Sequence, residues 1–245
     1  TICNEGIDGG VQITASHNPK EDNGIKLQVR NADAYSGGSL QKLYKKIVQE
    51  DVLTGEGMVE EIDAVTPYLN HVCALFPDIG DGMNIVIDSG NGVAGPAYKE
   101  AVSTVGASVT GLFIEPDGTF PNHAADPSKY DTLKDLQASV KDTASDMGLA
   151  FDGDGDRLGL VDENGVIRTA DEILLLLARD HLERNPGRAV VFTVSNSGAL
   201  ESEITAWGGR PVMTTVGHSF VEHAMRDNHA LLGGEQSGHF FCSEG

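Results

Sequence analysis

The sequence predicts an α/β fold in which helices cover parallel or mixed sheets. From residue 84 onward, short apolar runs typical of buried strands alternate with amphipathic segments typical of helices. That alternation is characteristic of sheets whose strands are joined by crossover helices. The chain has 245 residues, of which 40% are hydrophobic and 30 are glycine, and this composition suits one or two globular domains.

The elements can be assigned in order. Ser39 can cap a helix whose apolar side chains over 40–48 share one face. Pro96 can begin a helix that ends at Gly106, and Glu163-Asn164-Gly165 has the composition of a hairpin turn. The expected elements up to this hairpin are a helix at 40–48, strands at 84–88 and 107–114, a helix at 96–105, a helix entered at Asp131, a strand at 148–151, and hairpin strands at 158–162 and 166–168.

The same alternation continues beyond the hairpin. Ser219 and Glu222 have the spacing of a capping box at the last helix. The expected elements are helices at 171–183, 198–207 and 220–227 and strands at 189–194, 211–215 and 230–232. We place domain boundaries near Asp63 and Val166, which gives segments at 1–62, 63–166 and 167–245.

The charge balance excludes several classes of partner. The chain carries 37 acidic and 17 basic residues, a formal net charge of −20 and a pI near 4.5. Nucleic acids and anionic membranes bind basic patches instead. No apolar run approaches the ~20 residues of a membrane span, and Thr1 opens no signal peptide. Cys3, Cys73 and Cys242 lack metal or disulfide spacing, so we expect reduced thiols in a cytoplasmic protein.

Three aspartates alternate with glycine in one short loop. In an extended loop, alternate side chains point the same way, so Asp152, Asp154 and Asp156 can direct three carboxylates at one point. Gly153 and Gly155 allow the backbone to fold closely around that point. Carboxylates so close together repel one another unless a hard divalent cation is bound. The loop therefore predicts a divalent metal site, with a structural acidic turn as the alternative.

A calcium-binding helix-loop-helix site competes with this interpretation. Counting from Asp152 as position 1, Glu163 lies at position 12, as in such a site. Position 6, however, is Arg157 instead of the required glycine, and the flanks read as strands. We favour a catalytic site in which Arg157, whose planar fork matches phosphate oxygens, holds a phosphate that shares the cation.

Ser16 is a candidate phosphoryl carrier. It follows the apolar stretch Val11-Gln12-Ile13 and precedes Asn18-Pro19. A serine hydroxyl needs a base, or a metal and a phosphate, to react at neutral pH. His17 beside it and Lys26 in the same segment could supply a proton donor and a cation. No Gly-x-Ser-x-Gly elbow surrounds Ser16, so phosphoryl transfer is favoured over acyl transfer, with a turn serine as the alternative.

The glycine spacing of residues 90–95 matches that of a dinucleotide-binding fingerprint. Gly90, Gly92 and Gly95 follow an expected strand and open a helix, and Glu115 lies 20 residues further on. A tight strand-to-helix turn requires the same glycines, and we favour it.

A third polar loop lies near the end of the chain. Glu235 and Ser237 alternate after an expected strand, so an acceptor and a donor face one side, as recognition of sugar hydroxyls requires. His218, preceded by Gly217 at the start of a helix, adds a titratable donor.

These motifs, in this order, resemble the α-D-phosphohexomutase family, most closely its phosphomannomutase/phosphoglucomutase branch. The matching residues are Ser16-His17-Asn18-Pro19, Asp152-Gly153-Asp154-Gly155-Asp156-Arg157 and Gly234-Glu235-Gln236-Ser237-Gly238-His239, together with 88–92 and 121–123. The resemblance implies a phosphoserine at Ser16, one Mg²⁺ held by that residue and by Asp152, Asp154 and Asp156, and sugar contacts from Glu235 and Ser237. His17, Lys26 and Arg157 match residues that surround the phosphate or assist proton transfer.

The resemblance also implies a reaction. Mannose or glucose 1-phosphate would be interconverted with the 6-phosphate through a phosphoserine enzyme, with glucose 1,6-bisphosphate as intermediate and activator. Gln236 is typical of the phosphoglucosamine mutase branch, whereas residues 217–220 resemble the mannose/glucose branch. Val194-Ser195-Asn196 stand where members often carry a lysine. A non-catalytic sugar-phosphate binder and a dinucleotide-dependent oxidoreductase remain as alternatives.

The family has four domains, and the chain resembles the end of domain 1, domain 2 and most of domain 3. We therefore expect successive αβα sandwich domains of a protein truncated at both ends. A piece without domain 4 lacks the distal phosphate-binding loop and need not be active. The sequence does not indicate an oligomeric state.

Overall fold

The computed structural model describes residues 6–243, so Cys3 lies outside the described residues. The chain forms two compact units. The first comprises the residues up to Ala15 together with Glu21–Pro77, and the second comprises Ser16–Lys20 together with the chain from Asp78 onward. The serine loop thus belongs to the second unit. No helix within residues 6–243 is long and apolar enough to cross a membrane.

From residue 6 onward, the first unit contains a two-stranded antiparallel sheet and two α-helices. Strand β1 (Gly9–Ile13) pairs with β2 (Ile25–Val29). The short 3-10 turn η1 (Arg30–Ala32), helix α1 (Gly37–Val48) and helix α2 (Val65–Leu75) follow.

Helix α1 confirms the expected helix but not its cap. The helix begins at Gly37, and the backbone N–H of Ser39 already donates to the carbonyl of Ser36. The expected Ser39 cap is therefore wrong, because Ser39 lies inside the first turn. Neither β2 nor α2 is among the expected elements; the Asp63 carboxylate accepts hydrogen bonds from Val65 and Thr66 at the start of α2.

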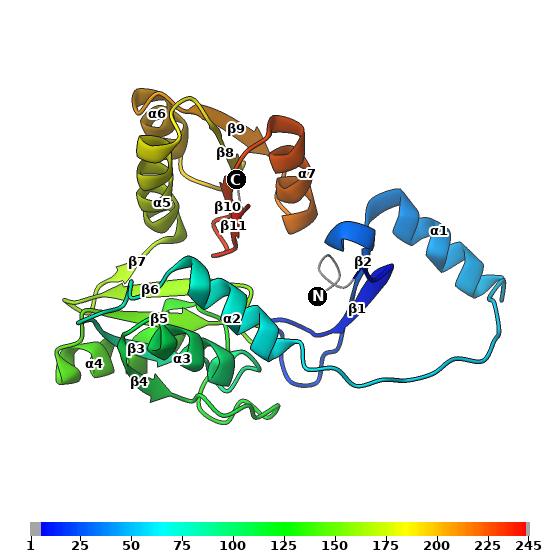
Figure 1. Ribbon diagram of the computed structural model, residues 1–245, viewed down its shortest axis with the longest axis horizontal. Coiled ribbons are helices and arrows are strands. Elements are labelled where there is room, and N and C mark those ends of the chain that lie inside the picture. Colours follow the sequence, from blue (N-terminus) through cyan, green and yellow to red (C-terminus); the bar gives the residue numbers. More distant parts are fainter. Residues whose placement is uncertain (1–5, 244–245) are drawn as a thin grey trace. The chain divides into compact units, whose positions relative to one another are not determined.

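Five strands form the first sheet of the second unit, in the order β4-β3-β5-β6-β7 (Figure 1). Strand β3 (Asn84–Asp88) runs parallel to β4 (Ser108–Leu112) and to β5 (Met147–Phe151). Strands β6 (Leu158–Asp162) and β7 (Ile167–Arg168) extend the sheet in antiparallel fashion. The sheet is therefore mixed, and the expected hairpin is confirmed.

Helices cover both faces of this sheet. Helix α3 (Gly95–Thr104) packs on one face, and the 3-10 turn η2 (Tyr130–Leu133) leads into α4 (Lys134–Thr143), which packs on the other. Successive side chains of β3 point to opposite faces. Accordingly Ile85 and Ile87 pack with residues of the α3 side, whereas Val86 packs against α4.

The second sheet of this unit has the order β11-β10-β8-β9. Strand β8 (Ala189–Thr193) runs parallel to β9 (Arg210–Thr214) and to β10 (Leu232–Gly234), and β11 (Phe240–Cys242) is antiparallel to β10. Strand β10 begins later than expected, and β11 is not among the expected elements.

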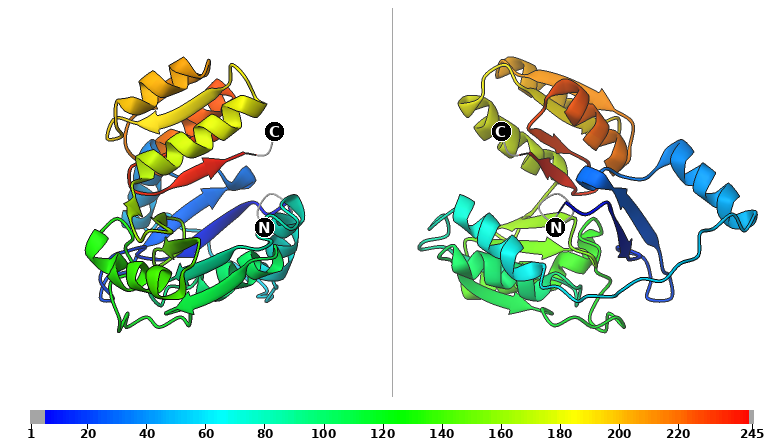
Figure 2. Two further views of the ribbon diagram at one scale, coloured as in Figure 1. Left: turned by 90° about the vertical axis from the view of Figure 1, so that its left-hand side faces the viewer. Right: turned by 45° about the vertical axis from the view of Figure 1, so that its right-hand side comes forward.

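Three helices cover the second sheet. Helices α5 (Ala170–Arg184) and α6 (Ala199–Ala206) lie on one face and α7 (His218–Asn228) on the other (Figure 2). Phe192 packs against α5 and α6, and its neighbour Val191 packs against α7. The alternation of strands and helices therefore yields the expected αβα sandwiches.

The capping box is not at the helix where the sequence places it. Helix α7 begins after Gly217 without a side-chain cap, so the expected Ser219/Glu222 box is wrong. The box forms instead at α5: the Thr169 hydroxyl accepts from the backbone of Glu172, and the Glu172 carboxylate accepts from the backbone of Thr169. Ser219 lies within the first turn of α7, where its hydroxyl cannot take the cap position.

Candidate active site

The aspartate loop leaves the sheet at the same edge as the glycine loop. Strands β3 and β5 are parallel neighbours, with Asp88 opposite Ala150. Their carboxyl ends therefore open onto one edge, which is where ligands bind in open α/β sheets. The loop after β5 carries the three aspartates.

The three carboxylates converge as the sequence predicts. Asp152, Asp154 and Asp156 each offer an oxygen, and these oxygens lie within 4.8 Å of one another. Burial, together with the charges of Asp156 and Asp154, raises the pKa of Asp152 to about 6, although the hydrogen bond from Ser16 opposes the shift. A divalent cation would relieve this repulsion, and an all-oxygen donor set suits Mg²⁺ or Ca²⁺. The residues present therefore fit a hard divalent metal.

The helix-loop-helix calcium interpretation does not fit the fold. The aspartate loop is followed by strand β6, and Glu163 lies beyond the far end of that strand. Five residues of strand separate the two by roughly 16 Å at about 3.3 Å per residue. Glu163 instead accepts a hydrogen bond from the side chain of Asn164, its neighbour in the hairpin turn.

Ser16 lies against the aspartate cluster. Its hydroxyl donates to Oδ2 of Asp152 over 2.8 Å, and its Oγ lies 3.2 Å from Nδ1 of His17. The backbone of Ser16 has φ of 55°, a left-handed conformation that is uncommon for a serine. A Cβ on Gly153 would stand 2.3 Å from the Ser16 carbonyl oxygen. The two loops therefore meet backbone to backbone, and only glycine fits at position 153.

Arg157 stands beside the same cluster. Its backbone N–H donates to Oδ1 of Asp152 over 3.2 Å, and its side-chain Nε lies 3.8 Å from Oδ2 of Asp152. The side chain is 13% exposed, and Nε is buried without a hydrogen bond to any residue of the described part of the chain. A buried guanidinium donor of this kind fits an anionic ligand. Burial and the Arg157 charge lower the pKa of His17.

The glycine loop is packed against protein backbone. A Cβ on Gly92 would stand 2.9 Å from the carbonyl oxygens of Asp152 and Gly153, and a Cβ on Gly95 would stand 2.2 Å from that of Ile114. Backbone N–H groups of this loop donate to protein acceptors, that of Val93 to Gly153 and that of Asn91 to Phe113. Those N–H groups are not directed at a pyrophosphate, so the dinucleotide interpretation loses its support and the tight turn accounts for the glycines.

Glu235 and Ser237 of the third polar loop make polar contacts with neighbouring residues of the same domain. Glu235 is 3% exposed; its Oε1 accepts from the backbone of Gly217 over 2.8 Å, and its Oε2 lies 3.0 Å from Nδ1 of His239. Burial would raise the pKa of Glu235, but the hydrogen bonds from His239 and Gly217 lower it overall. The Ser237 hydroxyl lies 2.9 Å from Nδ1 of His239. His218 is the first residue of α7.

His239 joins this loop to the aspartate loop. Its Nε2 lies 3.2 Å from Oδ1 of Asp156, while Nδ1 faces Glu235. Burial disfavours the imidazolium, but the hydrogen bonds to Asp156 and Glu235 raise the pKa of His239 to about 9. The backbone of Leu158 also donates to Gly238 over 3.0 Å. His239 stands in the quoted motif, yet sequence reasoning assigns it no role, because its partner lies 83 residues away.

A cavity of about 480 Å³ lies where the two sheets of the second unit meet. It brings together the ends of β8, β9 and β10 with the segment before η2. Its lining includes Glu235 and Ser237 as well as Gln236, Ser195, Tyr130 and Arg168.

The expected role of Lys26 near the phosphate stays a prediction, and Asn196 is held by hydrogen bonds within its own domain. Lys26 lies on β2, opposite Gln12, and belongs to the first unit. Asn196 serves the fold: its Oδ1 accepts from the backbone and hydroxyl of Thr193, and its Nδ2 donates to Asp171 at the start of α5.

Three consecutive segments of the chain match models of one protein family. Residues 66–165 match the family model described as phosphoglucomutase/phosphomannomutase, alpha/beta/alpha domain II. Residues 169–245 match domain III of the same family, and residues 1–53 match domain I.

Relatives cover the same range. The chain is 43% identical over 237 residues to a phosphomannomutase/phosphoglucomutase of Pseudomonas aeruginosa, which covers 96% of this chain and 50% of the relative. It is 43% identical over 244 residues to a phosphoglucomutase of Neisseria meningitidis serogroup A, covering 98% and 52%. A crystal structure of a phosphoglucomutase/phosphomannomutase family protein from Burkholderia thailandensis superimposes with a TM-score of 0.92 at 38% identity, covering 97% of this chain and 51% of that one.

The chain thus spans about half the length of the relatives it matches. The matches to domains I, II and III follow one another in the family's order, and they include all three motif loops. The chain belongs to the phosphoglucomutase/phosphomannomutase family of α-D-phosphohexomutases.

Proposed function

We propose that the whole protein interconverts the 1-phosphate and 6-phosphate of glucose or mannose. The observation that carries this proposal is the position of Ser16, whose hydroxyl donates to Asp152 within a cluster of three convergent carboxylates flanked by Arg157. A nucleophilic hydroxyl, a divalent metal site and a buried guanidinium are the groups that phosphoryl transfer requires.

Asp152, Asp154 and Asp156 would hold one Mg²⁺, with the phosphate on Ser16 completing the site. When bound, Mg²⁺ neutralises charge on the phosphoryl group and makes phosphorus more electrophilic. Arg157 would bind the phosphoryl oxygens through its planar fork, and its buried Nε is free of protein acceptors for that purpose in the described part of the chain. A role for Lys26, which the family resemblance associates with the phosphate, stays a prediction.

The reaction transfers a phosphoryl group without net hydrolysis. A sugar hydroxyl oxygen attacks phosphorus of phospho-Ser16, so that the new sugar O–P bond forms while the Ser16 Oγ–P bond breaks. The hydroxyl loses its proton and Ser16 Oγ gains one. His17 lies 3.2 Å from that Oγ, within reach to hold a proton there. The resulting hexose 1,6-bisphosphate reorients, and its other phosphoryl group returns to Ser16 by the reverse step.

The third loop would bind the sugar. Ser237 and Glu235 line the 480 Å³ cavity at the domain junction, and His218 begins the helix beside the loop. A cavity with a few convergent polar groups suits a small polar ligand. The phosphoglucosamine mutase alternative rests on Gln236, which lines the same cavity. A cytoplasmic location, expected from the scattered cysteines, stays a prediction.

The test uses the full-length protein, Mg²⁺ and glucose 1,6-bisphosphate as primer. Glucose 1-phosphate and mannose 1-phosphate should be converted to their 6-phosphates, and glucosamine phosphate should be a poorer substrate. Intact mass should show one phosphate that is lost in Ser16→Ala and kept in the control Ser36→Ala. Mutase turnover by the Ser16→Ala protein would contradict the proposal. So would a wild-type protein that binds NADH in the absence of substrate and shows no mutase turnover.

A further inference from the structure

Asp126 is a buried carboxylate that neither the sequence motifs nor the proposed metal site includes. The residue is 2% exposed and lies in the loop between β4 and η2. Its Oδ1 accepts hydrogen bonds from the backbone N–H of Ser128 over 3.2 Å and from the Ser128 hydroxyl over 2.6 Å. Its Oδ2 lies 3.2 Å from Nζ of Lys129. The side chain is therefore fixed in one orientation.

This carboxylate faces Arg157. Oδ1 of Asp126 lies 3.9 Å from a terminal nitrogen of the Arg157 guanidinium. Burial would raise the pKa of Asp126, but the hydrogen bonds from Ser128 and Lys129 lower it overall, so the side chain is charged at neutral pH. His17, the neighbour of Ser16, also lies within the electrostatic reach of both Asp126 and Arg157.

The guanidinium therefore lies between two buried carboxylates, Asp152 at 3.8 Å and Asp126 at 3.9 Å. Asp152 is shared with the proposed metal site, and a bound divalent cation would neutralise its charge. In the unphosphorylated protein, Arg157 would then face another cation, with Asp126 as its counter-charge. Asp126 is outside the cluster of three aspartates, so its charge stays available to Arg157.

We propose that Asp126 is a positioning residue for phosphoryl transfer: its carboxylate holds the Arg157 guanidinium beside the aspartate cluster. This inference rests on the proposed function for Arg157. Asp126 acts through the arginine and touches no reacting atom. Removing its charge should therefore lower the rate of the chemical step more than it weakens substrate binding.

The experiment compares Asp126→Asn with Asp131→Asn in the full-length protein. The two aspartates lie in the same segment, and each pairs with a lysine three residues later, but Asp131 is exposed and its pair with Lys134 lies at the surface. Asp126→Asn keeps an acceptor oxygen for Ser128 and loses the charge. We expect kcat to fall about tenfold and KM to change by less than about threefold. The fall in kcat should be smaller than the roughly hundredfold or greater loss that follows removal of a group that itself donates to the transition state. Asp131→Asn should match wild type in both.

A double-mutant cycle separates positioning from a general structural effect. In an Arg157→Gln background, Asp126→Asn should have no further effect on kcat. Additive losses would overturn the proposal, as would unchanged kcat in a folded Asp126→Asn protein. If Asp126→Asn does not fold, Ser128→Ala is used in its place, because loss of the 2.6 Å hydrogen bond from Ser128 leaves the Asp126 carboxylate less firmly oriented. A fall in kcat smaller than the tenfold expected for Asp126→Asn would support the proposal. A wild-type kcat would overturn it.

Calorimetry with Mg²⁺ alone provides a readout that does not depend on turnover. Asp126→Asn leaves Arg157 without its second counter-charge, so Mg²⁺ affinity should fall by about threefold in the wild-type background. In the Arg157→Gln background, Asp126→Asn should cause no further loss of Mg²⁺ affinity. Equal losses in both backgrounds would overturn the coupling. A wild-type protein without mutase turnover would contradict the proposed function, while this arm would still decide whether Asp126 acts on Arg157.

Discussion

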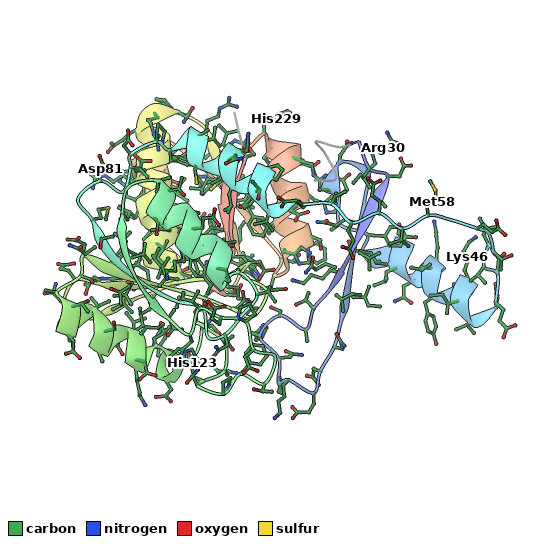
Figure 3. The ribbon with its side chains drawn as sticks, turned by 60° about the horizontal axis from the view of Figure 1, so that its bottom comes forward. Arg30, Lys46, Met58, Asp81, His123 and His229 are labelled. Carbon is green, nitrogen blue, oxygen red and sulfur yellow. The ribbon has the colours of Figure 1, made fainter. Side chains whose placement is uncertain are left out.

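The imidazole of His123 lies 3.2 and 3.1 Å, through Nε2, from the two carboxylate oxygens of Asp88. Its other nitrogen, Nδ1, lies 2.9 Å from the carbonyl oxygen of Ala124. Both partners accept hydrogen bonds, so the doubly protonated imidazolium satisfies both ring nitrogens. Asp88 is buried at the end of β3 and also accepts from the backbone of Gly90. The pair therefore ties the loop of His123, labelled in Figure 3, to the start of the glycine loop.

This pair predicts a pH-dependent stability. The hydrogen bond to Asp88 raises the pKa of His123 above 6.5, although burial opposes the shift. A raised pKa in the folded state means that the stabilisation is complete below the unfolded-state pKa and is lost as pH rises through the folded-state pKa. The melting temperature should therefore fall from pH 6 to pH 9 in wild type. His123→Gln should reduce that slope, and the exposed His223→Gln should keep it; an unchanged slope in His123→Gln would assign the pH dependence to other groups.

Asp154→Asn tests the metal site. A neutral amide would replace one of three converging carboxylates, and since affinity for hard cations depends on ligand charge, Mg²⁺ affinity measured by calorimetry should fall by about tenfold or more. Raised Mg²⁺ should restore part of the turnover of the full-length variant. Glu163→Gln is the matched control: a calcium loop that uses position 12 would lose affinity there, whereas the observed fold predicts no change. Wild-type affinity in Asp154→Asn would contradict the site.

Gly153→Ala tests the close approach of the two loops. The added Cβ would stand 2.3 Å from the carbonyl oxygen of Ser16, so the serine loop must move away from Asp152. Small displacements of a reacting group cost roughly a hundredfold in rate, and overpacking costs about 1–3 kcal/mol of stability. Gly118→Ala, where an added Cβ meets no atom within 4 Å, should keep both turnover and melting temperature. A Gly153→Ala protein with wild-type turnover would show that the contact is not needed.

Local sequence signals predicted the parts of the fold that local chemistry decides. The buried apolar run of β3 and the turn residues of the β6–β7 hairpin gave the bounds of β3 and β6 as the structure has them. Strand β11 escaped prediction because three residues after a glycine loop carry no periodic pattern, and their pairing with β10 is a tertiary choice. The aspartate loop was recognisable because its ligands are two residues apart.

The rest of the site depends on contacts between distant parts of the chain. His239 and Asp156 are 83 residues apart, and Ser16 and Asp152 are 136 apart. No periodicity connects such pairs. The sequence could therefore indicate which residues belong to the site but not which of them contact one another. The proximity of Asp126 to Arg157 could not be predicted for the same reason. A single carboxylate in a loop resembles an ordinary turn aspartate, and only the fold brings it close to Arg157.

Glu235 offers a test of whether the third loop binds the sugar or only shapes its own domain. Both of its carboxylate oxygens are engaged, one by the backbone of Gly217 and one by His239. Glu235→Ala would leave these donors without acceptors at a buried position, which costs about 1–3 kcal/mol of stability. Glu235→Gln keeps an acceptor for Gly217, so its melting temperature should lie between those of Glu235→Ala and wild type.

The two substitutions should differ less in activity than in stability. If Glu235 accepts hydrogen bonds from sugar hydroxyls, either variant leaves those hydroxyls without a charged partner, and kcat/KM of the full-length protein should fall by about ten- to a hundredfold for every hexose phosphate tested. Phosphoserine content should be kept in both, because Ser16 of the serine loop donates to Asp152 in the loop after β5, and Glu235 lies outside both of those loops. Wild-type kcat/KM in a folded Glu235→Gln protein would limit Glu235 to the structural role that its contacts with Gly217 and His239 already give it.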